Sequence, residues 1–168
     1  MTGLRINAGC GRHTLDGWTN VDLERSPKAS RAPDILADVR SIPLPDGCAD
    51  ELMAIHVFEH FYEWEVDALL TEWHRLLRSG GRLVLEMPDI VKSARNLLAS
   101  TADQLSMWGL YGDPREKNPL MCHKWGWTFA TIVPRLHRCG FIDAVESRPQ
   151  WHRVGADVRD FRVEAVRG

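Results

Sequence analysis

The stretch Leu4-Arg5-Ile6-Asn7-Ala8-Gly9-Cys10-Gly11 decides the fold that the sequence predicts. Residues 4–8 are typical of a buried strand, and the two glycines after them let the backbone turn sharply and approach a ligand closely. A second predicted strand, 19–23, contains Asp22 only 11 positions after Gly11. The connection between the two strands is barely long enough for a parallel crossover and has room for about one helical turn. The pattern indicates an α/β protein in which glycines and a carboxylate meet at the carboxyl ends of neighbouring strands.

Strands and helices alternate along the rest of the chain. The clearest helix covers 66–77, where apolar residues recur on one helical face, and Gly80 and Gly81 are expected to end it. Asp89 is expected to cap the next helix. That helix is expected to bury its apolar residues Ile90, Val91, Ala94, Leu97 and Leu98. The remaining expected elements are strands at 34–39, 50–57, 82–87, 142–148 and 158–166, and helices at 104–110 and 128–139.

Residues 100–127 lose clear periodicity and hold Gly109, Gly112, Pro114 and Pro119. A long irregular segment inside a compact domain is usually functional or disordered. We therefore interpret residues 1–168 as a single domain in which 100–127 form a lid or an acceptor-binding insertion. Strand–helix alternation followed by a closing strand pair predicts a mostly parallel sheet with an antiparallel edge strand.

The composition excludes several classes of protein. A net charge of −2 supplies no global positive field, so nucleic acid is not the expected partner. The polar first residues lead into no apolar run, and no stretch of about 18 apolar residues exists, so we expect neither a signal peptide nor a membrane span. The four cysteines are scattered and include no C-x-x-C pair. We interpret them as reduced thiols of a cytoplasmic protein and expect no zinc site on them.

Two familiar nucleotide-binding motifs are excluded by their spacing. The third glycine of a G-x-G-x-x-G motif would fall at Thr14. The acidic residue that binds the ribose of a dinucleotide lies about 20 residues downstream, farther than Asp22 does. No G-x-x-x-x-G-K-[ST] motif is present, which excludes a P-loop.

Carboxylates nevertheless follow successive predicted strands. Asp22 can accept charge-assisted hydrogen bonds from both hydroxyls of a ribose, and Asp38 can accept one from an adenine amino group. The alternative is that both are exposed carboxylates at the starts of loops. Because open α/β sheets bind ligands at the carboxyl ends of their strands, we favour the ligand-binding interpretation.

With these residues the chain resembles the class I S-adenosylmethionine-dependent methyltransferases, in particular the short methyltransferase-domain group. The resemblance runs from Leu4 to about Pro88 and continues more weakly to Phe141. Each motif alone is common, but their order and spacing together are specific. The motifs are Asn7-Ala8-Gly9-Cys10-Gly11, Asn20-Val21-Asp22, Asp38 with Ile42-Pro43-Leu44-Pro45-Asp46 and Asp50, His56-Val57-Phe58-Glu59-His60, and Leu76-Leu77-Arg78-Ser79-Gly80-Gly81-Arg82-Leu83.

The resemblance implies a Rossmann-like α/β fold. Its mostly parallel, seven-stranded sheet would have the order 3-2-1-4-5-7-6, with helices on both faces and a shortened first helix. It also implies S-adenosylmethionine as the cofactor. Gly9 and Gly11 would approach its methionine and ribose moieties, and Asp22 would bind the ribose.

The resemblance assigns further cofactor contacts. Asp38 and the backbone of Val39 would bind adenine, and His56 would face the sulfonium. The family usually has Asp or Glu where Asn7 stands and a third glycine where His13 stands. Asn7 can still donate and accept hydrogen bonds, so we expect weakened rather than absent cofactor binding.

Histidines supply the candidate catalytic residues. His56, Glu59 and His60 have a spacing that resembles the E-V-x-E-H motif with which small-RNA 2′-O-methyltransferases hold a divalent metal. Because the first position is His instead of Glu, we favour structural hydrogen bonds and expect no metal requirement. His123 precedes the last helix, where a histidine faces the substrate in similar short methyltransferases; the alternative is a loop packed by two tryptophans. We expect His123 to be the base or acceptor-orienting residue, with His60 second.

The predicted function is methyl transfer to an oxygen or nitrogen of a small polar acceptor, such as a sugar or another small metabolite. A nucleic-acid methyltransferase would need a basic surface, and the D/N-P-P-Y motif of amino methylation is absent. A third interpretation is a non-catalytic cofactor-binding module that serves a partner. Tight cofactor binding without methyl transfer would distinguish it.

Overall fold

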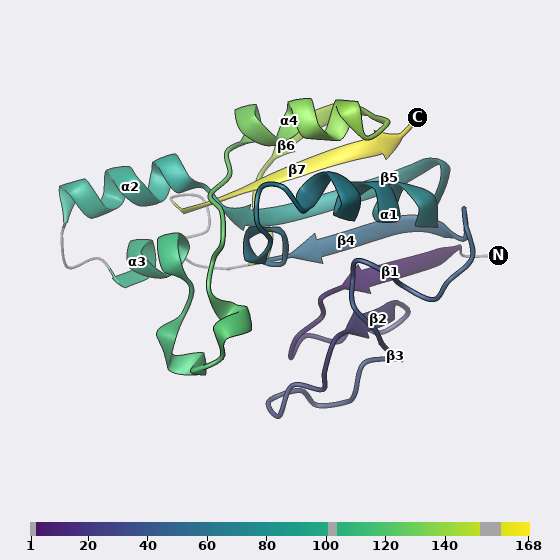
Figure 1. Cartoon of the computed structure of the whole chain (residues 1–168), viewed down its shortest axis with the longest axis horizontal. Helices are drawn as coiled ribbons and strands as arrows, with labels where there is room; N and C mark the ends of the chain where they lie inside the picture. Colours follow the sequence, from purple (N-terminus) through teal and green to yellow (C-terminus); the bar gives the residue numbers. More distant parts are fainter. Residues whose placement is uncertain (1–2, 101–103, 152–158) are drawn as a thin grey trace.

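Seven strands form one sheet in the order β3-β2-β1-β4-β5-β7-β6 (Figure 1). The computed structural model describes residues 3–100, 104–151 and 159–168. Neighbouring strands are parallel except where β7 pairs with β5 and β6. The predicted order and the antiparallel edge are confirmed. The strands are β1 (Leu4–Ala8), β2 (Thr19–Asp22), β3 (Ile35–Leu36), β4 (Ala49–Ile55), β5 (Leu77–Pro88), β6 (Phe141–Ser147) and β7 (Asp160–Arg167).

Four α-helices and three short 3-10 helices accompany the sheet in the described residues. The four helices predicted after residue 60 are all present, and Thr128 and Asp89 cap two of them through their side chains. The α-helices are α1 (Val66–Leu76), α2 (Ile90–Ala99), α3 (Gln104–Tyr111) and α4 (Phe129–Arg138), and the 3-10 helices are η1 (Phe58–His60), η2 (Pro114–Glu116) and η3 (Pro119–Met121). Residues 101–103 of the predicted lid and residue 158 of the predicted last strand lie outside the described residues.

One face of the sheet forms the hydrophobic core with α1 and α4. Ile6, Leu52, Leu83 and Ala165 are paired neighbours across β1, β4, β5 and β7, and each is at most 2% exposed. They belong to the same buried cluster as Trp73 of α1 and Ile132 of α4. Burial of this apolar layer is the main favourable contribution to folding.

The opposite face of the sheet carries ion pairs beside buried apolar residues such as Met53 and Val84. Arg82 on β5 lies 3.0 Å from Glu164 on β7 and 3.7 Å from Glu51 on β4. No helix of the described chain packs over this face, so the predicted second helical layer is not found there (Figure 1). The expected shortened first helix is also wrong, because residues 9–18 form only turns. The next connection, between β2 and β3, contains Pro27 and Pro33, which interrupt helices.

Two local predictions are corrected. Helix α1 ends because Leu77 is extended, whereas Gly80 (φ 72°) lies in the irregular start of β5. The expected buried face of α2 is exposed: Ile90, Val91 and Leu98 are 38%, 42% and 85% exposed. An apolar periodicity indicates a helix but does not supply the surface on which it packs.

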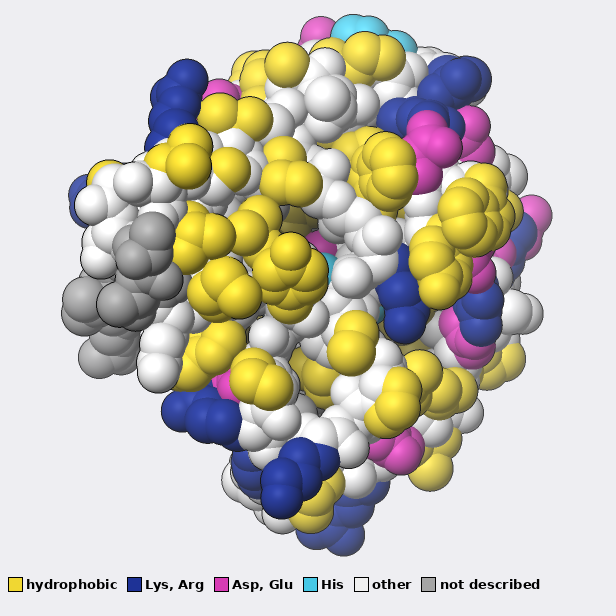
Figure 2. Space-filling view, turned by 60° about the vertical axis from the view of Figure 1, so that its left-hand side comes forward, with side chains coloured by type: hydrophobic (Ala, Val, Ile, Leu, Met, Phe, Trp, Pro, Cys, Tyr) yellow, Lys and Arg dark blue, Asp and Glu magenta, His cyan; other side chains and the backbone are white. Residues whose placement is uncertain are grey.

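Exposed apolar side chains gather on the face that carries α2 and α3 (Figure 2). They surround a hollow, and an acidic and a histidine side chain are visible below its rim. The exposed apolar residues on α2, α3 and η3 include Ile90, Val91, Leu98, Met107, Tyr111, Leu120 and Met121. Two of these residues, Leu120 and Met121, also line the cavity in which the predicted site residues meet.

Candidate active site

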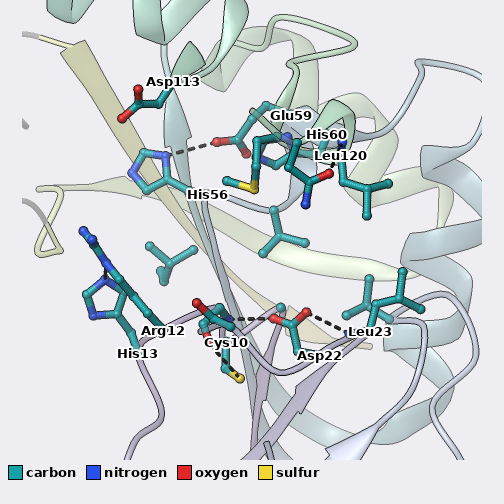
Figure 3. Close-up of a pocket in the computed structure, with 18 of the residues that line it drawn as sticks. Cys10, Arg12, His13, Asp22, Leu23, His56, Glu59, His60, Asp113 and Leu120 are labelled. Carbon is teal, nitrogen blue, oxygen red and sulfur yellow. Dashed lines mark hydrogen bonds and ion pairs between the residues drawn. The ribbon is translucent and has the colours of Figure 1, made fainter. Parts of the chain in front are cut away.

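A cavity of about 790 Å³ opens at the carboxyl ends of the parallel strands. This volume lies within the range of about 300–1,000 Å³ that is usual for small-molecule sites. The turns after β1, β2 and β4 form its floor, and residues 105–123 form its opposite wall (Figure 3). All residues that the sequence analysis assigned to the cofactor or to catalysis line it: Asn7, Gly9, Gly11, Asp22, Asp38, Val39, His56, His60 and His123.

The two glycines of the turn after β1 line the cavity. Gly9 and Gly11 both have positive φ, 68° and 53°. A Cβ at Gly9 would lie 2.5 Å from the Val57 side chain, so this glycine is required by packing. A Cβ at Gly11 would have no atom within 4 Å, so this glycine leaves open space where a ligand can approach.

Asp22 is fixed at the end of β2 by the glycine turn. Its Oδ2 accepts a hydrogen bond from the Gly11 amide at 2.6 Å, and its Oδ1 accepts from the Leu23 amide at 2.8 Å (Figure 3). A carboxylate has about four acceptor sites, so two remain for hydroxyl donors of a ligand. This arrangement matches a ribose site beside a backbone turn.

The buried side chain of Asn7 links the segment after β1 to β2 by hydrogen bonds. Its Nδ2 donates to the His13 carbonyl and to Asn20 Oδ1, both at 3.0 Å, and its side chain is buried. The amide therefore bridges β1, β2 and the chain between them. A carboxylate would lack these two donors, which gives a physical reason for Asn at this position.

Asp38 and Val39 lie on the cavity wall after β3. Asp38 forms a bidentate ion pair with Arg40, whose nitrogens lie 2.6–3.1 Å from its oxygens, and these hydrogen bonds hold the pKa of Asp38 below its usual value. The Val39 carbonyl accepts from Trp73 Nε1 at 3.0 Å. A carbonyl oxygen has two lone pairs, so this hydrogen bond leaves one of them for a second donor.

His56 occupies the position after β4 in a left-handed conformation, φ 53°. Such strain in a non-glycine residue is found mostly at functional sites. Its Nδ1 lies 3.0 Å from Glu59 Oε1 (Figure 3), and its Nε2 lies 3.6 Å from Asp160 Oδ2. Burial lowers the pKa of His56, but the hydrogen bonds and charges of the two carboxylates prevail and raise it to about 9. His56 is therefore an imidazolium at neutral pH.

The two carboxylates beside His56 stay ionised. Burial raises the pKa of Glu59, but its hydrogen bond with His56 and the charges of the surrounding histidines lower it to about 2. Asp160 also has a pKa of about 2, because His56 and Arg159 outweigh its burial. Arg159 donates to both oxygens of Asp160, at 2.6 and 2.9 Å. The four charges of this group sum to zero.

His60 and His123 face each other, with their ring centroids 4.9 Å apart. Nδ1 of His60 lies 3.2 Å from the Cys122 carbonyl, and Nδ1 of His123 lies 2.9 Å from the Gly109 carbonyl. A carbonyl only accepts, so Nδ1 of each ring donates, and in the neutral form of either ring Nε2 is then the nitrogen with the lone pair. Burial lowers the pKa of His123, which keeps this ring neutral.

The sequence analysis missed Asp160 and Arg159 as parts of the site. Asp160 is opposite Pro88 in the antiparallel pairing of β7 with β5, which brings it to the ligand edge of the sheet. A single acidic residue at the start of a strand does not by itself indicate a functional site. The alternative for the segment after His123 was a loop packed by two tryptophans. Only one of them packs inside: Trp127 is buried against Phe58, whereas Trp125 is 47% exposed.

Comparison with known proteins agrees with this geometry. Residues 9–85 match a family described as "Methyltransferase domain". No curated protein matches the sequence. Within the described residues no helix is both long and apolar enough to cross a membrane.

Many solved structures share the fold at low sequence identity. A SAM-dependent methyltransferase from Archaeoglobus fulgidus is 17% identical with a TM-score of 0.68, over 98% of this chain and 86% of that one. A SAM-dependent methyltransferase from Thermotoga maritima, described as a possible histamine N-methyltransferase, is 14% identical with a TM-score of 0.64, over 100% and 84% of the two chains.

The 1,6-didemethyltoxoflavin-N1-methyltransferase of Burkholderia thailandensis is 15% identical with a TM-score of 0.62, over 98% and 70% of the two chains. The turn at Gly11, the carboxylate of Asp22 and the size of the cavity suit S-adenosylmethionine. Family match over residues 9–85, fold and strand order together make the chain similar to the class I S-adenosylmethionine-dependent methyltransferases.

Proposed function

We propose that the enzyme methylates an oxygen or nitrogen atom of a small polar acceptor, with a sugar or another small metabolite as the preferred class. One observation carries the proposal. The neutral Nε2 of His123 and the ionised Glu59 lie 3.9 Å apart in the same cavity as Gly11 and Asp22. Groups that can accept a proton therefore line the same cavity as the residues proposed to bind the cofactor.

The cofactor half of the cavity is assigned to the strand ends. In this proposal the hydroxyls of the ribose donate to Asp22, the backbone at Gly9 and Gly11 contacts the methionine and ribose moieties, and Asn7 holds that turn. Asp38 and the backbone of Val39 contact the adenine, and Asp38 uses the lone pairs that Arg40 leaves. His56 lies toward the sulfonium, where Glu59 and Asp160 offset its positive charge.

The acceptor half is assigned to the histidine pair and to residues 105–123. When bound, S-adenosylmethionine supplies a methyl group on a positively charged sulfur, which leaves as a neutral thioether. The chain has to hold the acceptor atom in line with that methyl group, exclude water and receive one proton. His123 Nε2 receives the proton or orients the acceptor, and His60 is the second candidate.

A small acceptor is supported by the enclosing wall. Leu105 and Trp108 of α3 line the cavity together with Leu120 and Met121 of η3. The Burkholderia thailandensis neighbour was solved with a small acceptor and S-adenosylhomocysteine bound, which supports the same class here. The formal net charge of −2 gives no global attraction to a nucleic acid.

The test is a screen for S-adenosylhomocysteine formation with sugars, small hydroxylated and amino metabolites, and oligonucleotides as acceptors. We expect turnover with a member of the small-molecule set and none with oligonucleotides. Turnover with oligonucleotides alone would establish the nucleic-acid alternative. Tight cofactor binding without transfer to any acceptor class would establish the non-catalytic module.

A further inference from the structure

We infer that Glu59, His60 and His123 form a binding site for one divalent transition-metal ion. The inference deepens the proposed function and rests on it, because it assigns the acceptor atom at the same site as a hydroxyl oxygen. It departs from the metal-free site that the sequence analysis expects. We call these three residues the Glu59 cluster.

The ligand atoms of the Glu59 cluster converge on one point. A carboxylate oxygen of Glu59 and one ring nitrogen from each histidine all lie within 4.8 Å of one another. The three residues come from η1 and from the segment before α4, and all of them line the cavity (Figure 3). Small side-chain rotations would bring the three atoms to the distance of about 2.0–2.2 Å at which nitrogen and oxygen bind such ions.

Within the described part of the chain, one oxygen of Glu59 has no hydrogen-bond partner. Its side chain is 2% exposed, and Oε1 is hydrogen-bonded to His56 at 3.0 Å. Oε2 is buried and has no hydrogen-bond partner among the described residues. A buried anionic oxygen without a partner costs free energy, and a bound cation would remove that cost.

Both histidines have the hydrogen bonds that prepare an imidazole for a metal. Metal-binding histidines usually donate their second ring nitrogen to a carbonyl or carboxylate, which fixes the tautomer and the ring orientation. Here the Nδ1 atoms bond the carbonyls of Cys122 and Gly109. The Nε2 lone pairs are thereby left for an ion, and His123 Nε2 already lies 3.9 Å from Glu59 Oε1.

A second cluster of possible metal ligands lies nearby, but its carboxylates already have hydrogen-bond partners in the protein. His56, Glu86 and Asp160 also bring ligand atoms within 4.8 Å of one another. However, Glu86 accepts from the amides of Gln150 and Trp151 at 2.9 Å and from Arg162 at 3.2 Å. Arg159 pairs with Asp160 in the same way. Both oxygens of each of these two carboxylates already accept hydrogen bonds from the protein, whereas Glu59 Oε2 does not, so we place the ion at the Glu59 cluster.

The donor set indicates the class of ion and its role. Two imidazoles with one carboxylate suit Mn²⁺, Fe²⁺, Co²⁺ or Zn²⁺ better than Mg²⁺ or Ca²⁺, which prefer oxygen ligands. Three protein ligands leave coordination positions open to the cavity. There the ion would bind the acceptor's oxygen and lower the pKa of its hydroxyl. The proton leaves to water, so the oxygen reaches the methyl group already deprotonated. Of the two roles proposed for His123, this arrangement selects the second: the histidines orient the acceptor through the ion and do not receive its proton.

The test measures ion binding directly, without a need for the acceptor. Tag-free protein is stripped with a chelator and titrated with Mn²⁺, Co²⁺ and Zn²⁺ by calorimetry, and the Co²⁺ complex is examined by visible absorption. Wild-type protein should bind one ion per chain. His60→Ala, His123→Ala and Glu59→Gln should each weaken binding by at least about tenfold. His137→Ala, at an exposed histidine outside the cavity, should bind as wild type does.

Binding of S-adenosylhomocysteine by each variant checks that the cavity is intact. The inference is overturned if stripped wild-type protein binds none of the three ions, or if His60→Ala and His123→Ala bind them as tightly as wild type. Methyl transfer that survives EDTA would also overturn it and would leave the proposed function standing. Ion binding by a protein that does not bind S-adenosylhomocysteine would instead contradict the proposed function alone.

Discussion

The amide of Gly11 donates a 2.6 Å hydrogen bond to Oδ2 of Asp22, and this bond joins the turn after β1 to the end of β2. The two residues are 11 positions apart in a segment that forms no helix. The turn is therefore held by a side chain rather than by a helix N-terminus. Its geometry depends on a glycine in the left-handed region and on an ionised carboxylate beside it.

A comparison of two glycines tests the role of this turn. Gly11 and Gly17 both have positive φ, 53° and 75°, but only Gly11 lines the cavity. Replacing either by Ala should cost about 1 kcal/mol of stability, because side chains with a Cβ rarely adopt this conformation. Only Gly11→Ala should also weaken S-adenosylhomocysteine binding, as measured by calorimetry. Equal loss of affinity in both variants would show that the effect is one of stability.

The charge of His56 predicts how stability depends on pH. Its pKa rises from about 6.5 in the unfolded chain to about 9 in the fold. The folded state then holds the proton more tightly, so the stabilisation is complete below pH 6.5 and is lost as the pH rises through 9. The free energy of unfolding of wild-type protein should fall over this window. His56→Asn tolerates the same backbone conformation and should show a smaller fall. Identical pH dependence in both proteins would contradict the assignment of the charge.

The segment 104–127 is predicted to be dynamic. Its helix α3 buries only Ser106 and Gly109, whereas α1 buries five apolar residues. Amide hydrogen exchange should therefore be faster in α3 than in α1 in the free protein. Cofactor and acceptor together should slow it, if the segment closes over them. Exchange in α3 as slow as in α1 without any ligand would contradict a mobile wall.

His123 is predicted to act in turnover and not in cofactor binding. His123→Ala removes the Nε2 that faces Glu59 and should lower kcat by about 10²–10⁴-fold, while the affinity for S-adenosylhomocysteine stays nearly unchanged. The exposed His137 provides the matched control, and His137→Ala should keep wild-type kinetics. Full turnover by both His123→Ala and His60→Ala would mean that neither histidine takes or orients the acceptor's proton.

The sequence predicted which residues from the ends of β1 and β2 line the cavity, whereas their contacts with the cofactor stay a prediction. Gly9, Gly11 and Asp22 follow strands whose apolar pattern is clear, and all three line one cavity. The strand order, in contrast, depended on the resemblance to a family, because periodicity does not specify which strands pair.

The acceptor half was harder to predict because it depends on long-range pairing. Asp160 reaches His56 only through the antiparallel pairing of β7 with β5. The sequence analysis favoured a structural role for Glu59, and its burial among three histidines could not be read from the local spacing. The exposed apolar face of α2 was missed for a related reason, since periodicity does not show whether a partner surface exists.

Calorimetric titration with S-adenosylhomocysteine tests the central claim most directly, because it asks whether Asp22 and the glycine turn hold the cofactor. Wild-type protein should bind with roughly micromolar affinity, about −8 kcal/mol. Asp22→Ala should lose about 1.5–3 kcal/mol for each hydrogen bond removed, which is at least about a tenfold loss of affinity. Asp16→Ala, at a fully exposed aspartate on the same connection, should bind as wild type does. Wild-type protein that binds NAD but not S-adenosylhomocysteine, or an Asp22→Ala variant with unchanged affinity, would contradict the account.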